Sequence, residues 1–129
     1  MRKALLLGLL LAGPIWAEDD VADQPEMIEV IMPELEGMAV EGQVAYQRSC
    51  AECHGINAGG LEEHGPPLIM DLYGPSERSD MDIILVIQLG HEQENWSYGD
   101  MSPPENIGFA EQGMVVEFLR QVQFANGVE

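Results

Sequence analysis

Two stretches of the sequence repeat apolar residues at the spacing of an α-helix. The first begins near Val40 and runs into Cys50, and its apolar positions fall on one side: Val40, Val44, Ala45 and Tyr46. The second spans residues 110–125, and its shared face carries Met114, Phe118 and Val122. The pattern therefore predicts an amphipathic helix near each end of the folded part of the chain.

A third apolar stretch, residues 79–90, is ambiguous because its β-branched residues also suit a buried strand. Ser79 followed by Asp82 resembles a capping box, which marks the start of a helix. Gly90 is a natural helix stop. These end signals favour a helix over a strand.

Residues 55–68 and 91–108 are rich in glycine and proline, which predicts two long loops. We therefore expect an all-α domain over residues 40–129, with about three main helices and no sheet. About 90 residues with few aromatic side chains bury little apolar surface for a stable domain. A large apolar group bound at the centre would resolve this shortage.

Residues 1–39 do not share these patterns. A basic start and an apolar run, residues 4–12, are followed by Ala17, a small residue suited to cleavage. The run is shorter than the roughly 20 residues that span a bilayer. We expect a signal peptide over residues 1–17, cleaved after Ala17, and a periplasmic protein.

The acidic segment at residues 18–39 contains Pro25 and Pro33 and has no clear period, so we expect a mobile leader. Its short apolar piece, residues 27–32, leaves an alternative open, in which that piece docks in extended form.

The charge of the chain restricts its partners. Without residues 1–17, only Arg48, Arg78 and Arg120 oppose 23 acidic residues, so the formal net charge is −20. Coulomb repulsion then excludes nucleic acid and anionic membrane surfaces and permits a basic protein partner. The same acidity also suits solubility in salt, and the sequence does not choose between these two roles.

Both cysteines of the chain lie in the stretch CAECH, residues 50–54. A zinc site would need two more ligands from His54, His64 and His91, and no second close pair exists. A thioredoxin-like redox pair opens a helix after a buried strand, whereas this motif ends a helix. The spacing C-x-x-C-H is the attachment signature of c-type haem, in which one helical turn presents both cysteines to the vinyl groups.

From about residue 40 to residue 127 the chain resembles a small class I cytochrome c of the short bacterial type. Gly42 and Tyr46 stand where this family places the glycine and the aromatic residue of its first helix. The resemblance implies the cytochrome c fold, with long loops wrapped around one haem c that is covalently attached through Cys50 and Cys53.

The resemblance also assigns roles around the haem, with His54 as the proximal iron ligand. The stretch GPPL matches the family's G-P-x-L, so the Pro66 carbonyl is expected to accept a hydrogen bond from the His54 ring. Leu68 resembles the leucine packed on the haem face. Trp96 resembles the tryptophan whose indole N–H binds a haem propionate. Met101, in the stretch GDMSPP, is expected to be the sixth iron ligand.

One departure and several alternatives accompany this ligand assignment. Ser102 stands where many relatives have a proline directly after the methionine. Met70 and Met81 are alternative methionine ligands, and His91 would give bis-histidine ligation. His64 is expected to face the solvent.

We therefore expect a monomeric electron-transfer protein, not an enzyme, that carries one electron at a time between a donor and an acceptor protein. The family's best-known members present lysines around the exposed haem edge, whereas this chain has none there, so its partners are expected to be basic. Two alternatives stay open. One is a ligand-binding or peroxide-handling haem protein with an open or labile sixth site, and the other is a dedicated cytochrome subunit of a periplasmic oxidoreductase complex.

Overall fold

The structure is a computed structural model that describes residues 21–129, so the expected signal peptide lies outside it. The described backbone forms four α-helices and no strand: α1 (Met38–Ser49), α2 (Ala51–His54), α3 (Asp80–Leu89) and α4 (Phe109–Ala125). Two short 3-10 helices, Val21–Asp23 and Asp71–Tyr73, lie in the connecting segments. The prediction of an all-α fold is confirmed, with α1, α3 and α4 as its main helices. None of the helices in this part of the chain is long and apolar enough to span a membrane.

The ambiguous third stretch is a helix, α3, and the expected signals set its ends. The Ser79 hydroxyl accepts a hydrogen bond from the Asp82 backbone N–H at 3.2 Å, and the Asp82 carboxylate accepts one from the Ser79 backbone N–H at 2.8 Å. At the other end Gly90 adopts a φ of 74°, a conformation that favours glycine and ends the helix. Local end signals therefore outweighed the β-branched content of this stretch.

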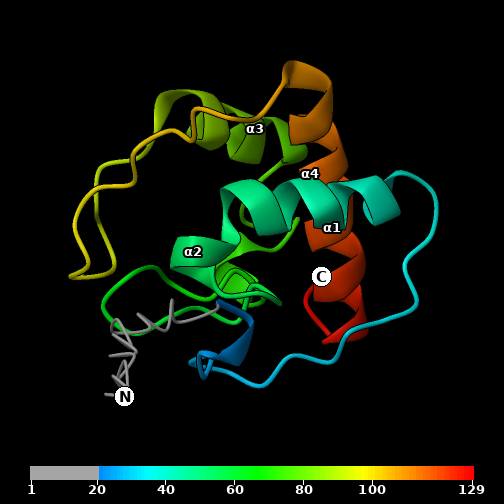
Figure 1. The fold of residues 1–129 in the computed structure, drawn as a ribbon, viewed down its shortest axis with the longest axis horizontal. Helices are drawn as coiled ribbons and strands as arrows, with labels where there is room; N and C mark the ends of the chain where they lie inside the picture. Colours follow the sequence, from blue (N-terminus) through cyan, green and yellow to red (C-terminus); the bar gives the residue numbers. More distant parts are fainter. Residues whose placement is uncertain (1–20) are drawn as a thin grey trace, which may run out of the picture.

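Helices α1 and α4 cross at close range, and this crossing organises the domain (Figure 1). At the crossing Gly42 faces the backbone of α4, where an added Cβ atom would overlap the carbonyl group of Met114. Along the same contact, the rings of Tyr46 and Phe118 have centroids 5.0 Å apart. Both side chains are completely buried. The glycine thus permits the approach that lets the two rings meet.

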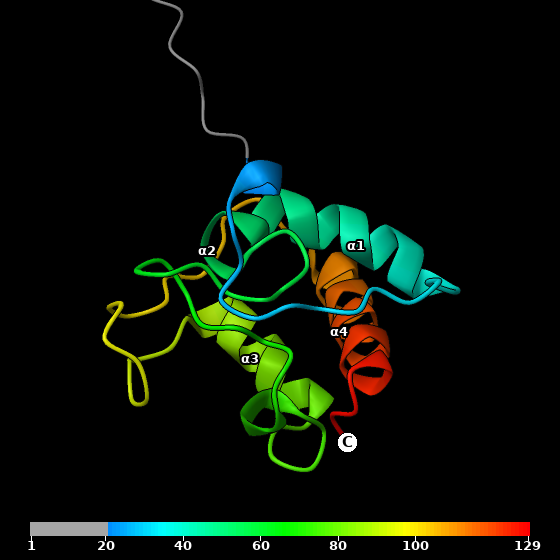
Figure 2. The ribbon, with the colours of Figure 1, turned by 90° about the horizontal axis from the view of Figure 1, so that it is seen from below.

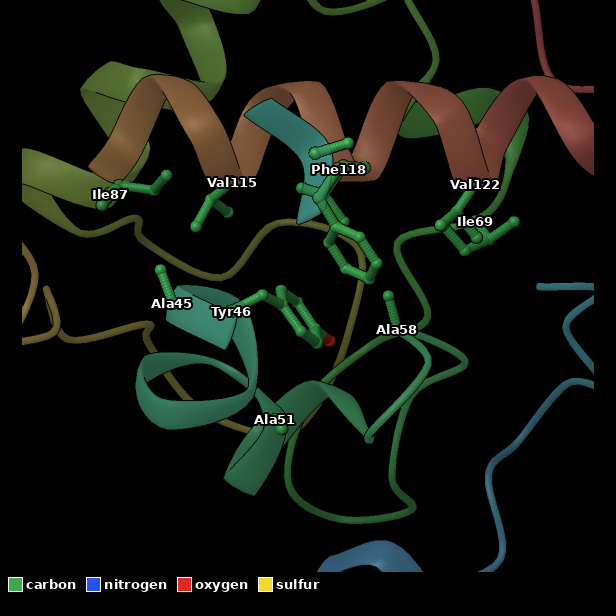
Figure 3. Close-up of a cluster of buried hydrophobic side chains, with 11 residues drawn as sticks. Ala45, Tyr46, Ala51, Ala58, Ile69, Ile87, Val115, Phe118 and Val122 are labelled. Carbon is green, nitrogen blue, oxygen red and sulfur yellow. The ribbon is translucent and has the colours of Figure 1, made fainter. Parts of the chain in front are cut away.

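The hydrophobic core lies between this crossing and the loop that follows α2 (Figure 3). The Tyr46 hydroxyl donates to the Gly55 carbonyl at 2.8 Å, which ties α1 to that loop. Small and medium side chains surround the two rings, among them Ala45, Ala51, Ala58, Ile69, Ile87, Val115 and Val122. With so many alanines, the side chains alone build a small core, which agrees with the shortage expected from the composition.

Residues 21–37, which we call the N-terminal segment, run along the domain toward the start of α1 (Figure 2). The backbone N–H of Met27 donates to the Gly60 carbonyl at 2.9 Å. Farther along, Ile31 exchanges two hydrogen bonds with the Asn126 side chain, at 2.9 and 2.8 Å. These bonds attach the segment both to the loop after α2 and to the end of α4.

The expectation of a mobile leader over residues 18–39 is therefore wrong for its described part, and residues 27–32 dock in extended form. The Glu26 carboxylate accepts a hydrogen bond from the Asn57 backbone N–H at 2.7 Å, and apolar side chains pack on the core: Ile28, Val30, Met32 and Leu35. An acidic segment stays disordered when its contacts cannot offset the conformational entropy that it loses on ordering. Here the folded loop supplies backbone donors and an apolar surface. In addition α1 begins at Met38 and buries Ala39, so the helical domain starts slightly before residue 40.

Candidate functional site

The CAECH motif forms a helical turn of its own directly after α1. Cys50 ends α1 and precedes α2, so Cys50, Cys53 and His54 follow one another around a single turn. The His54 backbone N–H donates to the Cys50 carbonyl at 3.0 Å, which closes the turn. Two thiols and one imidazole are thereby brought to one cavity.

The two thiols do not form a disulfide, and Cys50 is half-buried while Cys53 is exposed. The pKa of the Cys50 thiol is raised to about 11, mainly by burial and to a smaller extent by the nearby Cys53. Burial and the Glu52 carboxylate also raise the pKa of Cys53. Reactive redox cysteines sit in electropositive surroundings that lower the thiol pKa. This pair therefore lacks the electrostatic environment of a redox-active dithiol.

The His54 ring is buried and held in one orientation. Its Nδ1 lies 2.9 Å from the Pro66 carbonyl oxygen, so the hydrogen bond expected from the sequence is present. Because a carbonyl oxygen can only accept, Nδ1 donates and the lone pair of Nε2 stays free. Burial lowers the pKa of His54, although the bond to Pro66 acts in the opposite direction. A neutral imidazole with a fixed tautomer is well prepared to bind a metal ion.

A cavity of about 380 Å³ opens beside this turn. Every site residue expected from the sequence lines it: Cys50, Cys53, His54, Pro66, Leu68, Trp96 and Met101. These residues come from the α1–α2 junction, the loop after α2 and the loop between α3 and α4. In Figure 1 the last of these loops, drawn in yellow, extends beside α2 and the green loop. The fold thus gathers three distant segments around one space.

The loop between α3 and α4 is closed at its base by an antiparallel bridge. His91 and Met101 exchange two backbone hydrogen bonds, at 3.0 and 2.9 Å. Met101 lines the cavity, whereas Met70 and Met81 do not, and Met81 is 59% exposed on α3. Of the methionines that the structure describes, Met101 is the one that lines the cavity. Its role as an iron ligand stays a prediction.

The Trp96 indole belongs to a group of polar donors at the cavity wall. Its Nε1–H donates to the Tyr73 hydroxyl oxygen at 2.8 Å, so the haem propionate contact expected for Trp96 stays a prediction. Tyr73 and Arg78 also line the cavity. Burial raises the pKa of Tyr73, whereas the Trp96 hydrogen bond and the nearby Arg78 charge lower it.

Sequence reasoning did not identify Tyr73 and Arg78 as site residues. The one available signal was that Arg78 is among the few cations of a chain with no lysine beyond Lys3. The two ion pairs of the described chain engage the other two arginines, Arg48 with Glu111 and Arg120 with Asp80. Arg78 thus differs from them in lining the cavity.

The cavity wall fits a large and mainly apolar group that also carries polar edges. Ser49 Oγ is buried beside the cavity without a hydrogen-bond partner among the described residues. Buried polar atoms normally have partners, so this orphan indicates a group that would supply one. Apolar side chains line much of the remaining wall, including Leu68, Ile83, Val86, Ile87, Val115 and Leu119. Thiols, a free imidazole nitrogen and apolar walls together fit a covalently bound haem.

The fold is all-α, and a C-x-x-C-H turn, a histidine held in one orientation and a methionine surround one cavity. These features together are those of a c-type haem domain. A family model described as cytochrome c matches residues 39–123, which is well over half of the chain. The protein therefore belongs to the cytochrome c family, whose members bind haem c and typically transfer electrons. No curated protein matches the chain.

Proposed function

We propose that the protein is a periplasmic one-electron carrier whose haem c is bound through Cys50 and Cys53, with His54 and Met101 as the axial ligands. The observation that carries this proposal is the placement of His54 and Met101. A neutral histidine with a free Nε2 and a methionine line the same cavity, on segments that the sequence separates widely. Histidine–methionine ligation is typical of cytochromes c and raises the reduction potential of the iron.

The bound haem would supply an iron centre that alternates between Fe(III) and Fe(II), with a potential raised by the methionine sulfur. The chain's own residues hold and shield it. Pro66 fixes the tautomer of His54 and increases the basicity of the ligating nitrogen. Leu68 and its apolar neighbours on the cavity wall would exclude water from the macrocycle. Tyr73 and Arg78 would provide O–H and N–H donors for its carboxylates, and Trp96 would do so if its Nε1–H turned from Tyr73 to the haem.

The first test is the visible spectrum of the purified holoprotein, oxidised and reduced, with and without carbon monoxide. We expect a methionine–iron charge-transfer band in the oxidised protein and a reduced spectrum that carbon monoxide leaves unchanged, because both axial positions are filled. Rapid carbon monoxide binding by the wild-type protein would favour the ligand-binding alternative. Absence of a haem spectrum from protein matured in a host that attaches haem would contradict the proposal as a whole.

We also propose that the protein meets basic partners, because its described surface offers them acidic groups near the cavity. Exposed Glu52 precedes the exposed Cys53 and lines the cavity, as do the exposed Asp82 and Asp100. Arg48 and Arg120 are already engaged in ion pairs. An excess of exposed negative charge attracts a cationic partner and accelerates the encounter at low ionic strength.

Small electron acceptors of opposite charge test this electrostatic proposal. We expect the oxidation rate of the reduced protein by a cationic cobalt(III) chelate to fall as salt rises, since the Debye length shrinks to about 10 Å at 0.1 M. Oxidation by ferricyanide, which is anionic, serves as the matched control and is expected to become faster under the same change. If both rates proved indifferent to salt, surface charge would have no part in docking.

A further inference from the structure

His91 and Met101 lie opposite each other at the base of the loop between α3 and α4. They are directly opposite in the antiparallel bridge and exchange backbone hydrogen bonds of 3.0 and 2.9 Å. Residues directly opposite one another in such a pair project their side chains to the same side, a few ångströms apart. Both side chains are half-buried and both line the 380 Å³ cavity. The bridge therefore places a histidine next to the expected methionine ligand.

The base of this loop keeps the pair together through the backbone rather than through either side chain. A Cβ atom added to Gly90 would overlap the Met101 carbonyl group, so glycine is needed for this close approach. Within the loop, the Gln93 backbone N–H donates to the Asp100 carboxylate at 2.9 Å, and the Gln93 side chain donates to the Gly99 carbonyl at 3.0 Å. Removing the Met101 side chain should therefore leave His91 where it is.

The other imidazoles of the described chain are less suited to reach the side of the cavity where Met101 lies. His54 is bound to Pro66 through Nδ1 and is the expected proximal ligand. His64 also lines the cavity, but it is exposed, and its Nδ1 lies 2.8 Å from the Glu62 carbonyl oxygen in the loop next to Pro66. The His91 ring, in contrast, forms no hydrogen bond with another described residue, so neither ring nitrogen would have to give up a protein partner.

We propose that His91 is a reserve axial ligand, which binds the haem iron when the Met101 sulfur is absent or displaced. This inference rests on the proposed function, because it assumes a haem with Met101 as its resident sixth ligand. The exchange transfers no electron: one iron–sulfur bond breaks, and the lone pair of an imidazole nitrogen forms an iron–nitrogen bond. Because methionine ligation raises the potential, the exchanged state would be harder to reduce and would donate electrons more readily.

Four variants of the holoprotein test the proposal: M101A, H91A, M101A/H91A and M101A/H64A. We expect M101A to lose the methionine–iron band but to stay low-spin and six-coordinate, and M101A/H64A to match it. M101A/H91A should become high-spin and bind carbon monoxide readily. If His91 occupies the iron in nine of ten M101A molecules, carbon monoxide should bind about tenfold more weakly to M101A than to M101A/H91A. H91A alone should keep the wild-type spectrum.

A high-spin M101A protein with the same carbon monoxide affinity as M101A/H91A would overturn the proposal. So would loss of the low-spin state in M101A/H64A, which would assign the replacement to His64. If M101A failed to fold, the volume-conserving M101L would answer the same question. The wild-type spectrum separates the reserve-ligand proposal from the proposed histidine–methionine ligation. A bis-histidine spectrum of the wild-type protein that H91A abolishes would refute both proposals. A methionine band in the wild-type protein together with a high-spin M101A would refute the reserve ligand alone.

Discussion

Replacing both Cys50 and Cys53 with alanine is expected to yield a chain that cannot attach haem covalently and that, in its haem-free form, does not fold stably. The two thiols are the only groups that can attach the haem covalently, since the chain has no other cysteine. Without haem the cavity of about 380 Å³ beside His54 is filled by water or left empty. The surrounding core of small side chains cannot close over such a space.

The size of the cavity indicates how large the effect should be. Empty apolar cavities in protein cores destabilise by about 24 cal/mol per Å³. For 380 Å³ this corresponds to about 9 kcal/mol, an upper figure because water enters the polar part of the site. The total stability of a domain is typically about 5–15 kcal/mol. Loss of the haem should therefore remove most or all of the stability.

Circular dichroism and hydrogen exchange of the purified C50A/C53A protein would measure this effect. For the haem-free protein we expect little persistent helix and exchange protection close to that of an unfolded chain. The wild-type chain produced without haem attachment serves as the control and should behave in the same way. A cooperatively folding C50A/C53A protein without haem would show that the side-chain core is sufficient, contrary to our interpretation of the cavity.

Replacing Gly42 with alanine is expected to destabilise the holoprotein by about 3 kcal/mol, at the upper end of the range for overpacked sites. The added methyl group would overlap the backbone carbonyl of Met114, which cannot rotate away as a flexible side chain could. Helices α1 and α4 would have to separate, and the contact between the Tyr46 and Phe118 rings would loosen. The site is affected indirectly, because α1 carries Cys50 at its end.

Gly113 offers a matched control, since it is also a helical glycine but an added Cβ atom would meet nothing within 4 Å. Alanine there should stabilise the protein by about 0.5–1 kcal/mol, because alanine loses less backbone entropy than glycine in a helix. Urea unfolding of the two holoproteins should thus shift the midpoints in opposite directions, with little change in the slope m. If both variants shifted the unfolding midpoint equally and in the same direction, helix propensity and not the helix crossing would determine the stability effect of alanine at position 42.

Much of the helical structure could be predicted because helix ends are marked by local chemistry. The reciprocal bonds of Ser79 and Asp82, and the positive φ of Gly90, depend on neighbours in the sequence. For that reason α3 was predictable despite its ambiguous apolar run. The C-x-x-C-H turn is likewise a local unit, since Cys50 and His54 lie within one turn of helix.

Features that depend on contacts between distant segments were predicted poorly. The N-terminal segment has no period and many acids, and its docking depends on Gly60 and Asn126, which no local pattern connects with it. Tyr73 was missed because its partner Trp96 lies on a different loop, and Arg78 because only the folded chain brings it to the cavity. Where the resemblance to a family supplied the distant partner, as for Pro66 and His54, the expected hydrogen bond is present.

The sequence by itself determined the helices, the haem-attachment motif and the strongly negative charge, because each depends on residue types and short spacings. Only the tertiary structure decided which residues share the cavity, that residues 21–37 pack on the domain, and that His91 stands directly opposite Met101. The physical reason is that local backbone preferences act over a few residues. The walls of a cavity and the pairing of two chain segments are determined by packing and hydrogen bonds between parts of the chain that only folding brings together.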